Sequence, residues 1–108
     1  MTWLESINKV AAEIHNNAKD KGFWDNPRND GEAIALIHSE LSEALEALRH
    51  GNPPDDKVPE FSGVETELAD AIIRICDLAH GRNWKVFEAM QAKMDFNKTR
   101  ERLHGKEF

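Results

Sequence analysis

The sequence predicts an all-α fold in which four helices form a bundle-like chain. Apolar residues recur at three- and four-residue spacing in four segments, capping residues precede these segments, and no segment alternates as a β-strand does. The chain has 108 residues, which fits a single domain over residues 1–108 with a modest core.

The first two helices are predicted from their caps and apolar stripes. A capping box, Thr2 with Glu5, precedes a helix over about 3–19. The second helix is expected to begin near Asn29 or Asp30 and to end before the glycine and prolines of "HGNPP". Its apolar stripe, expected to be the seam of the bundle, consists of Ile34, Ile37, Leu41, Leu45 and Leu48.

Two more helices are predicted after a proline-rich linker. A second capping box, Ser62 with Glu65, begins a helix that is expected to end at Gly81. The fourth helix is expected to begin near Asn83 and to place Trp84 in the core.

Composition narrows the class of protein. Twenty acids against 14 bases give a net charge of −6, which disfavours binding to a nucleic-acid polymer. The one cysteine, Cys76, allows no disulfide within the chain and no thiolate zinc site. The first residues lack the apolar core of a signal peptide, and no apolar run approaches the roughly 20 residues of a membrane span. We therefore expect a cytoplasmic protein that does not bind membranes.

Two pairs of carboxylates stand at i, i+3 spacing on the second and third helices. Glu40 and Glu43 lie roughly 120° away from the apolar seam, whereas Glu46 has the position of an ordinary solvent residue. Glu67 and Asp70 belong to a narrow charged stripe on a helix that is apolar over more than half of its circumference. A single pair of this kind is usually solvated surface, but two pairs on consecutive helices favour a shared site.

Convergence of these pairs would require a cation. Four carboxylates in one cleft repel one another unless they are neutralised. Oxygen ligands select Mg²⁺, with Mn²⁺ as a substitute, and Mg²⁺ commonly completes its shell with substrate phosphates. The acid pairs therefore predict a metal site that binds a phosphorylated substrate.

The same residues resemble a known family. "ELSE" (residues 40–43) followed by "ELAD" (residues 67–70) is similar to the ExxE…ExxD signature of the MazG-like all-α nucleoside triphosphate pyrophosphohydrolases, and "KMDFNKTRERLHGKEF" resembles their C-terminal segment. The resemblance implies hydrolysis of an NTP or dNTP to a nucleoside monophosphate and pyrophosphate, with nucleotide-pool house-cleaning as a role. It implies that the metal-binding and catalytic residues are Glu40, Glu43, Glu67 and Asp70.

Candidate substrate contacts lie outside the acid pairs. The resemblance implies that Lys93 and Asn97 bind phosphate, and Arg100 shares their helical face. Candidates for the nucleobase are the loop aromatics Phe23 and Trp24 and, less favoured than a core role, His38.

Charge spacing also suggests a role for one further acid. Asp77 continues the charged stripe of the third helix, and we expect it to pair with Arg74.

An oligomer is expected from the apolar third helix. Three short helices cannot cover the arc through Ala69, Ile73 and Cys76 and still leave a cleft open. A two-fold dimer, or a dimer of dimers, would cover it, with the cleft near the subunit boundary. Such assemblies are common in the MazG-like family, as the resemblance also implies.

Two other functions remain open at this stage. A phosphoribosyl-ATP pyrophosphohydrolase would use the same metal site with a different base. A non-catalytic acidic helical module that binds a protein partner would have no affinity for metal.

Overall fold

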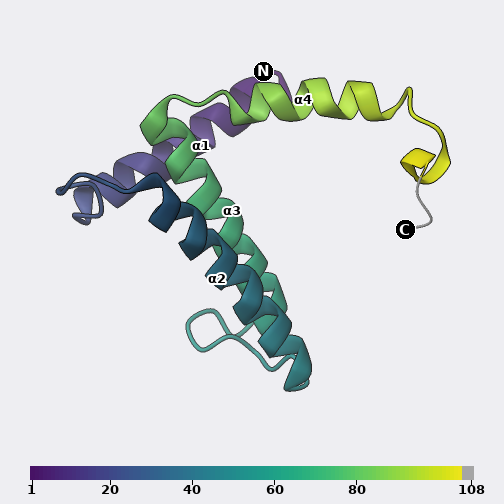
Figure 1. The fold of residues 1–108 in the computed structure, drawn as a ribbon. Coiled ribbons are helices and arrows are strands. Elements are labelled where there is room, and N and C mark those ends of the chain that lie inside the picture. The colour runs from purple at the N-terminus through teal and green to yellow at the C-terminus, as the bar shows by residue number, and fades with distance from the viewer. Residues whose placement is uncertain (106–108) are drawn as a thin grey trace.

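The computed structural model describes residues 1–105, except for the side chain of His104. Four α-helices follow one another along the chain: α1 (Trp3–Asp20), α2 (Asp30–Arg49), α3 (Gly63–Arg82) and α4 (Val86–Asn97), with a 3₁₀ turn at Arg102–Gly105. Helices α2 and α3 lie side by side and antiparallel, α1 crosses them at one end, and α4 projects away (Figure 1). The predicted all-α chain of four helices is confirmed. Within the described range no helix combines the length and apolar character needed to cross a bilayer.

The helix starts follow the predicted caps. The hydroxyl oxygens of Thr2 and Ser62 accept hydrogen bonds from the backbone N–H groups of Glu5 and Glu65, and both capping boxes are complete. Asn29 caps α2 in the same way. Local sequence therefore sets where these three helices begin.

The end of α3 differs from the prediction. The helix continues through Gly81 to Arg82 and is capped by Asn83, which adopts the left-handed conformation with φ 56°. As a result α4 begins at Val86 rather than near Asn83. Trp84 lies in the connection and is 45% exposed, so the prediction that it belongs to the core is wrong.

Gly81 serves packing rather than helix termination. A Cβ atom at this position would lie 2.5 Å from the Trp24 ring and 2.9 Å from the ring of His15. The absence of a side chain lets the loop between α1 and α2 close onto α3. The glycine is therefore explained by an aromatic ring that lies 57 residues earlier in the chain.

Asp77 anchors this loop. Its buried carboxylate accepts hydrogen bonds from Trp24 Nε1 at 2.9 Å and from Arg28 at 3.1 Å, and His15 Nδ1 lies 2.8 Å away. The predicted partner of Asp77, Arg74, pairs with a residue of α2 instead.

The core of the chain is small. Among residues 1–105, only two of the buried apolar residues are larger than cysteine; the set is Ala11, Ala33, Ala44, Ala71, Cys76, Leu78, Ala79 and Phe87. Alanines at the contact allow α2 and α3 to approach closely. Of the arc that was expected to need a second subunit, Cys76 is covered by its own chain, next to Ala11 and Phe87, whereas Ala69 and Ile73 are exposed.

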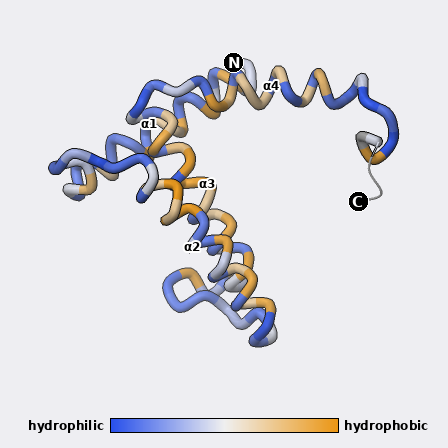
Figure 2. Tube along the Cα trace, in the orientation of Figure 1, coloured by the Kyte–Doolittle hydropathy of each residue, from blue (hydrophilic) through white to orange (hydrophobic). Residues whose placement is uncertain are grey.

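The predicted seam of α2 faces outward in this chain. Four of its five residues are between 46% and 55% exposed: Ile34, Leu41, Leu45 and Leu48. Leu68 and Ile72 of α3 are similarly exposed, and Figure 2 shows hydrophobic segments along both helices. The stripe exists as predicted, but it does not pack within the single chain.

Gly81→Ala should lower the free energy of unfolding by about 1–3 kcal/mol, because the added methyl group overlaps the Trp24 ring. Gly31→Ala is the matched control: it also lies in a helix, and its Cβ would meet only the Asn29 side chain, at 3.2 Å. Urea denaturation should find the control within about 1 kcal/mol of the wild type. Equal effects of the two substitutions would contradict the packing role of Gly81.

Candidate functional site

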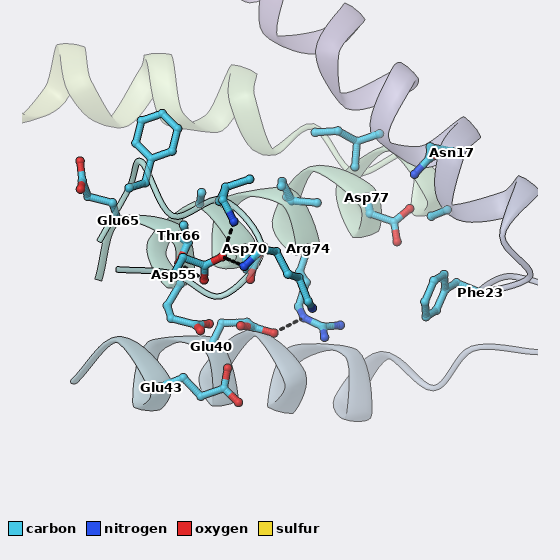
Figure 3. A pocket seen from close by; sticks show the side chains of 18 of the residues that line it. Asn17, Phe23, Glu40, Glu43, Asp55, Glu65, Thr66, Asp70, Arg74 and Asp77 are labelled. Carbon is cyan, nitrogen blue, oxygen red and sulfur yellow. Dashed lines mark hydrogen bonds and ion pairs between the residues drawn. The ribbon is translucent and has the colours of Figure 1, made fainter. Parts of the chain in front are cut away.

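The two predicted acid pairs meet between α2 and α3. Single carboxylate oxygens of Glu40, Glu67 and Asp70 all lie within 4.8 Å of one another. Glu43 stands one turn along the same face of α2 and lines the same cavity (Figure 3). These four residues are called the acid cluster below. Their i, i+3 spacing and the antiparallel helices bring them together.

Burial and mutual repulsion disturb the protonation of the acid cluster. Burial, together with hydrogen bonding to Glu40 and Glu43, raises the pKa of Glu67 to about 8. Burial and then the charge of Glu40 raise the pKa of Asp70 above its ordinary value. Burial also acts to raise the pKa of Glu40, but hydrogen bonds from Glu67 and Arg74 outweigh it, so that this pKa is lowered. The cluster therefore holds a proton at neutral pH when no cation is bound.

One oxygen of the cluster lacks a partner. Oε2 of Glu67 is inaccessible to solvent and has no hydrogen-bond partner among residues 1–105 when the carboxylate is ionised. Burial is the main cause of the raised pKa of Glu67, and protonation also lets this residue donate a hydrogen bond to Glu40 or Glu43. A bound cation would satisfy the same oxygen without the proton.

Arg74 supplies the positive charge nearest to the cluster. Its Nε donates to Oε1 of Glu40 at 3.0 Å, and this is the only ion pair that any of the four acids makes in the described part of the chain. The Arg74 side chain is 35% exposed and lies on the cavity wall, whereas the Glu40 side chain is 10% exposed. Sequence spacing did not identify this pair, because its partners lie on different helices.

The acid cluster forms one wall of an open cavity of about 1300 Å³. The remaining walls come from the end of α1, the loop after it and the linker between α2 and α3 (Figure 3). Apolar side chains such as Ile14 and Ile73 line it together with the cations Arg28 and Lys57. The cavity thus combines acids, bases and apolar surface, and its volume is larger than the roughly 300–1,000 Å³ of a typical small-molecule pocket.

The linker contributes residues that sequence reasoning missed. Asp55, Lys57 and Phe61 all line the cavity. Asp55 holds the linker in shape: backbone N–H groups of Val58 and Lys57 and the Thr66 hydroxyl donate to it, and the Val58 bond is the main cause of its lowered pKa. The signal available was the charged run "DDK" between prolines.

The predicted phosphate ligands do not reach this cavity. Lys93 and Asn97 lie on α4, Arg100 follows it, and all three are exposed. None of them lines the cavity, since α4 projects away from the α2–α3 pair (Figure 1). Within one chain they stand apart from the acid cluster.

The three predicted base contacts have different environments. Phe23 lines the cavity and is 67% exposed. Trp24 is absent from the wall; its indole N–H donates to Asp77, and its ring lies beneath the guanidinium of Arg28. His38 is exposed and also absent from the wall, so its predicted core position is wrong.

The donor set fits Mg²⁺ or Mn²⁺. Only carboxylate oxygens converge, and both ions prefer oxygen ligands. A divalent cation would give the unpartnered oxygen of Glu67 a partner and would lower the raised pKa values of Glu67 and Asp70. Glu40, Glu67 and Asp70 are therefore the residues that would hold it, with Glu43 beside them.

Without metal, the protein should lose stability as the pH rises from about 4.5 to about 8. Glu67 has its ordinary pKa of 4.5 when unfolded and about 8 when folded, so over this range the folded state binds more protons. Glu40, whose pKa is lowered, acts in the opposite direction only at more acidic pH. Glu67→Gln should remove this loss, because the amide needs no proton to donate a hydrogen bond.

The measurement is the melting temperature between pH 5.5 and 8.5, compared between wild type and Glu67→Gln, with EDTA present. Glu65→Gln is the control, since Glu65 serves the cap of α3 and its substitution leaves Glu67 in place. If the melting temperatures of the wild type and of Glu67→Gln change with pH in parallel, Glu67 does not carry the proton.

Comparison of the chain with known proteins identified no relative. No protein-family model matches the chain, and no curated protein and no solved structure is detectably similar to it. The function of the chain is therefore inferred from the charge and geometry of the acid cluster and the cavity.

Proposed function

We propose that this protein is a Mg²⁺-dependent nucleotide pyrophosphohydrolase that converts an NTP or dNTP to a nucleoside monophosphate and pyrophosphate. The observation that carries the proposal is the acid cluster: three carboxylate oxygens from two helices within 4.8 Å, on the wall of an open cavity. The MazG-like pattern of the same four acids supports it.

The chain's own residues would divide the work of binding. Glu40, Glu43, Glu67 and Asp70 would hold the cation, which when bound neutralises phosphate charge and lowers the pKa of a water molecule. Lys57 and Arg28 are cations on the cavity wall that can attract the phosphates. Phe23 and Phe61 offer apolar rings against which a base can lie.

The protein is proposed to work as a homodimer or a dimer of dimers. The chain exposes 8187 Å², against about 6,100 Å² expected for a compact monomer of 12.3 kDa. Its radius of gyration is 16.3 Å, against about 13 Å expected for a domain of this length. A surplus of about 2,000 Å² on each chain corresponds to about 4,000 Å² in a dimer, which lies within the roughly 2,000–5,000 Å² that permanent interfaces bury in total. The exposed apolar stripes of α2 and α3 give that interface its core.

Assembly would also explain the position of α4. Lys93 and Asn97 lie on a helix that leaves the body of its own chain. In a two-fold dimer a projecting helix can extend over the partner's cavity. We propose that Lys93 and Asn97 reach the phosphates of the nucleotide bound by the partner subunit, with Arg100 beside them.

Two alternative functions can be distinguished by measuring turnover with a panel of substrates. A phosphoribosyl-ATP pyrophosphohydrolase would cleave that substrate in preference to NTPs and dNTPs. A non-catalytic protein-binding module would show neither turnover nor stabilisation by metal. The buried, unpartnered oxygen of Glu67 favours the metal-dependent enzymes over the module.

A panel of NTPs, dNTPs and phosphoribosyl-ATP with Mg²⁺ should yield monophosphate and pyrophosphate from at least one substrate. Glu43→Gln and Asp70→Asn should each reduce turnover by about a hundredfold or more, since each removes a ligand charge. Glu46→Gln, an exposed acid one turn further along α2, should retain wild-type turnover. Release of diphosphate and orthophosphate instead would contradict the proposed cleavage site.

Leu45→Asp should convert the assembly to monomers, because it places a charge in the proposed interface core. Leu103→Asp is the control: this leucine is 56% exposed, compared with 52% for Leu45, but lies outside α2 and α3. Light scattering during size-exclusion chromatography gives the mass of each variant. A wild type that elutes at 12.3 kDa and hydrolyses nucleotide would contradict the assembly.

The shared site has a further consequence for mixed assemblies. Glu43→Gln and Lys93→Ala should each be inactive alone, but a dimer with one of each contains one site in which both wild-type residues meet. Unfolding and refolding an equimolar mixture should restore roughly a quarter of the wild-type turnover, as statistical pairing gives. No recovery would place Lys93 outside the partner's site.

A further inference from the structure

Arg74 lines the cavity next to the acid cluster and forms an ion pair with one of its four carboxylates. Its Nε contacts the most buried of the four acids, Glu40, at 3.0 Å. No second carboxylate pairs with this guanidinium in the range 1–105. A buried ion pair that uses one nitrogen of an arginine leaves its two terminal amino groups for another acceptor.

The surroundings of Arg74 permit the guanidinium to move. About a third of its side chain is exposed, and it lies between the acid cluster and the open volume of the cavity (Figure 3). Glu40, in contrast, is held on the contact face of α2, where it is 8% exposed. A flexible cation next to a fixed carboxylate can exchange one anionic partner for another within reach of its side chain.

We propose that Arg74 is a built-in counter-ion that occupies Glu40 in the metal-free protein and turns to a phosphate group of the substrate once Glu40 binds the divalent ion. The inference rests on the proposed function, because it assumes that the acid cluster binds metal. The guanidinium and a divalent cation repel each other, so close contact of both with Glu40 is unfavourable. A triphosphate brought into the cavity offers the oxygens that the freed guanidinium needs.

This arrangement makes Arg74 oppose metal binding and support nucleotide binding. Substitution by an uncharged residue should therefore move the two affinities in opposite directions. A purely structural ion pair would instead weaken both, since its loss would disorder Glu40. Arg74 is thus a substrate-binding and positioning residue whose effects can be separated from those of the four acids.

The test uses two titrations that require no turnover. The first measures the Kd of Mn²⁺ for the protein alone by calorimetry. The second measures, at saturating Mn²⁺, the Kd of a nucleotide whose α,β-bridging oxygen is replaced by methylene, so that it cannot be cleaved at the proposed bond.

Arg74→Met should bind Mn²⁺ at least about fivefold more tightly and the nucleotide analogue about tenfold or more weakly. Arg74→Lys keeps the charge but loses the planar donors, so its Mn²⁺ affinity should stay within about threefold of wild type while the analogue still binds more weakly. Arg49→Met removes the same charge from the exposed end of α2 and should change neither constant appreciably. If Arg74→Met does not fold, Arg74→Gln replaces it.

The outcomes distinguish this inference from the proposed function. Wild-type protein that binds Mn²⁺ and the analogue, with Arg74→Met moving both constants in the same direction or neither, would overturn the role of Arg74 alone. Wild-type protein that takes up no Mn²⁺ would overturn the metal site and this inference together. If Arg74→Met changes the Kd of Mn²⁺ and the Kd of the analogue in opposite directions, while Arg49→Met changes neither, the result would support the exchange of Glu40 for a phosphate group as the partner of Arg74.

Discussion

Carboxylates held within 4.8 Å of one another repel strongly, and the structure around α2 and α3 depends on how this repulsion is relieved. In the metal-free protein a proton on Glu67 and the guanidinium of Arg74 provide relief. Neither reduces the repulsion between the carboxylates as much as a divalent cation would, because such a cation carries two charges and can contact several oxygens at once. A cation bound at this position, as we propose, would therefore remove the cost in stability that the repulsion causes.

The same helix contact leaves large apolar side chains of α2 and α3 exposed on the single chain. Alanines such as Ala33, Ala44 and Ala71 bring α2 and α3 together, so that the carboxylates can meet. The small contact residues displace the large ones, and leucines and isoleucines of both helices remain on the outside. A second copy would cover these stripes and, through α4, would bring cations to the cavity. In the proposed assembly, the site and the interface would thus both follow from the way in which α2 and α3 pack.

Much of this arrangement could be predicted because it is local. The capping boxes at Thr2 and Ser62 fix helix starts through contacts three residues apart, and i, i+3 spacing places each acid pair on one face. Features that depend on contacts between distant segments could not be read in this way. Gly81 looked like a helix terminator because its neighbour Trp24 is far away in sequence.

The sequence also could not predict toward which part of the structure an apolar stripe faces. Periodicity showed that Leu41 and Leu45 share a face, but not whether that face meets the same chain or another. The partners of Arg74 and Asp77 depend on the register between helices and loops, and the linker entered the cavity through tertiary packing. The acid cluster could be anticipated from sequence, whereas its counter-ion and most of its cavity could not.

The central claim is that the acid cluster binds a divalent metal ion. A crystal structure of the protein grown with Mn²⁺, with anomalous diffraction data, tests it most directly. If the acid cluster binds the ion, the map should show an anomalous peak about 2.0–2.3 Å from carboxylate oxygens of Glu40, Glu67 and Asp70, with Arg74 turned away from Glu40. A map without a peak between these residues, in crystals that hold Mn²⁺ elsewhere or not at all, would contradict it.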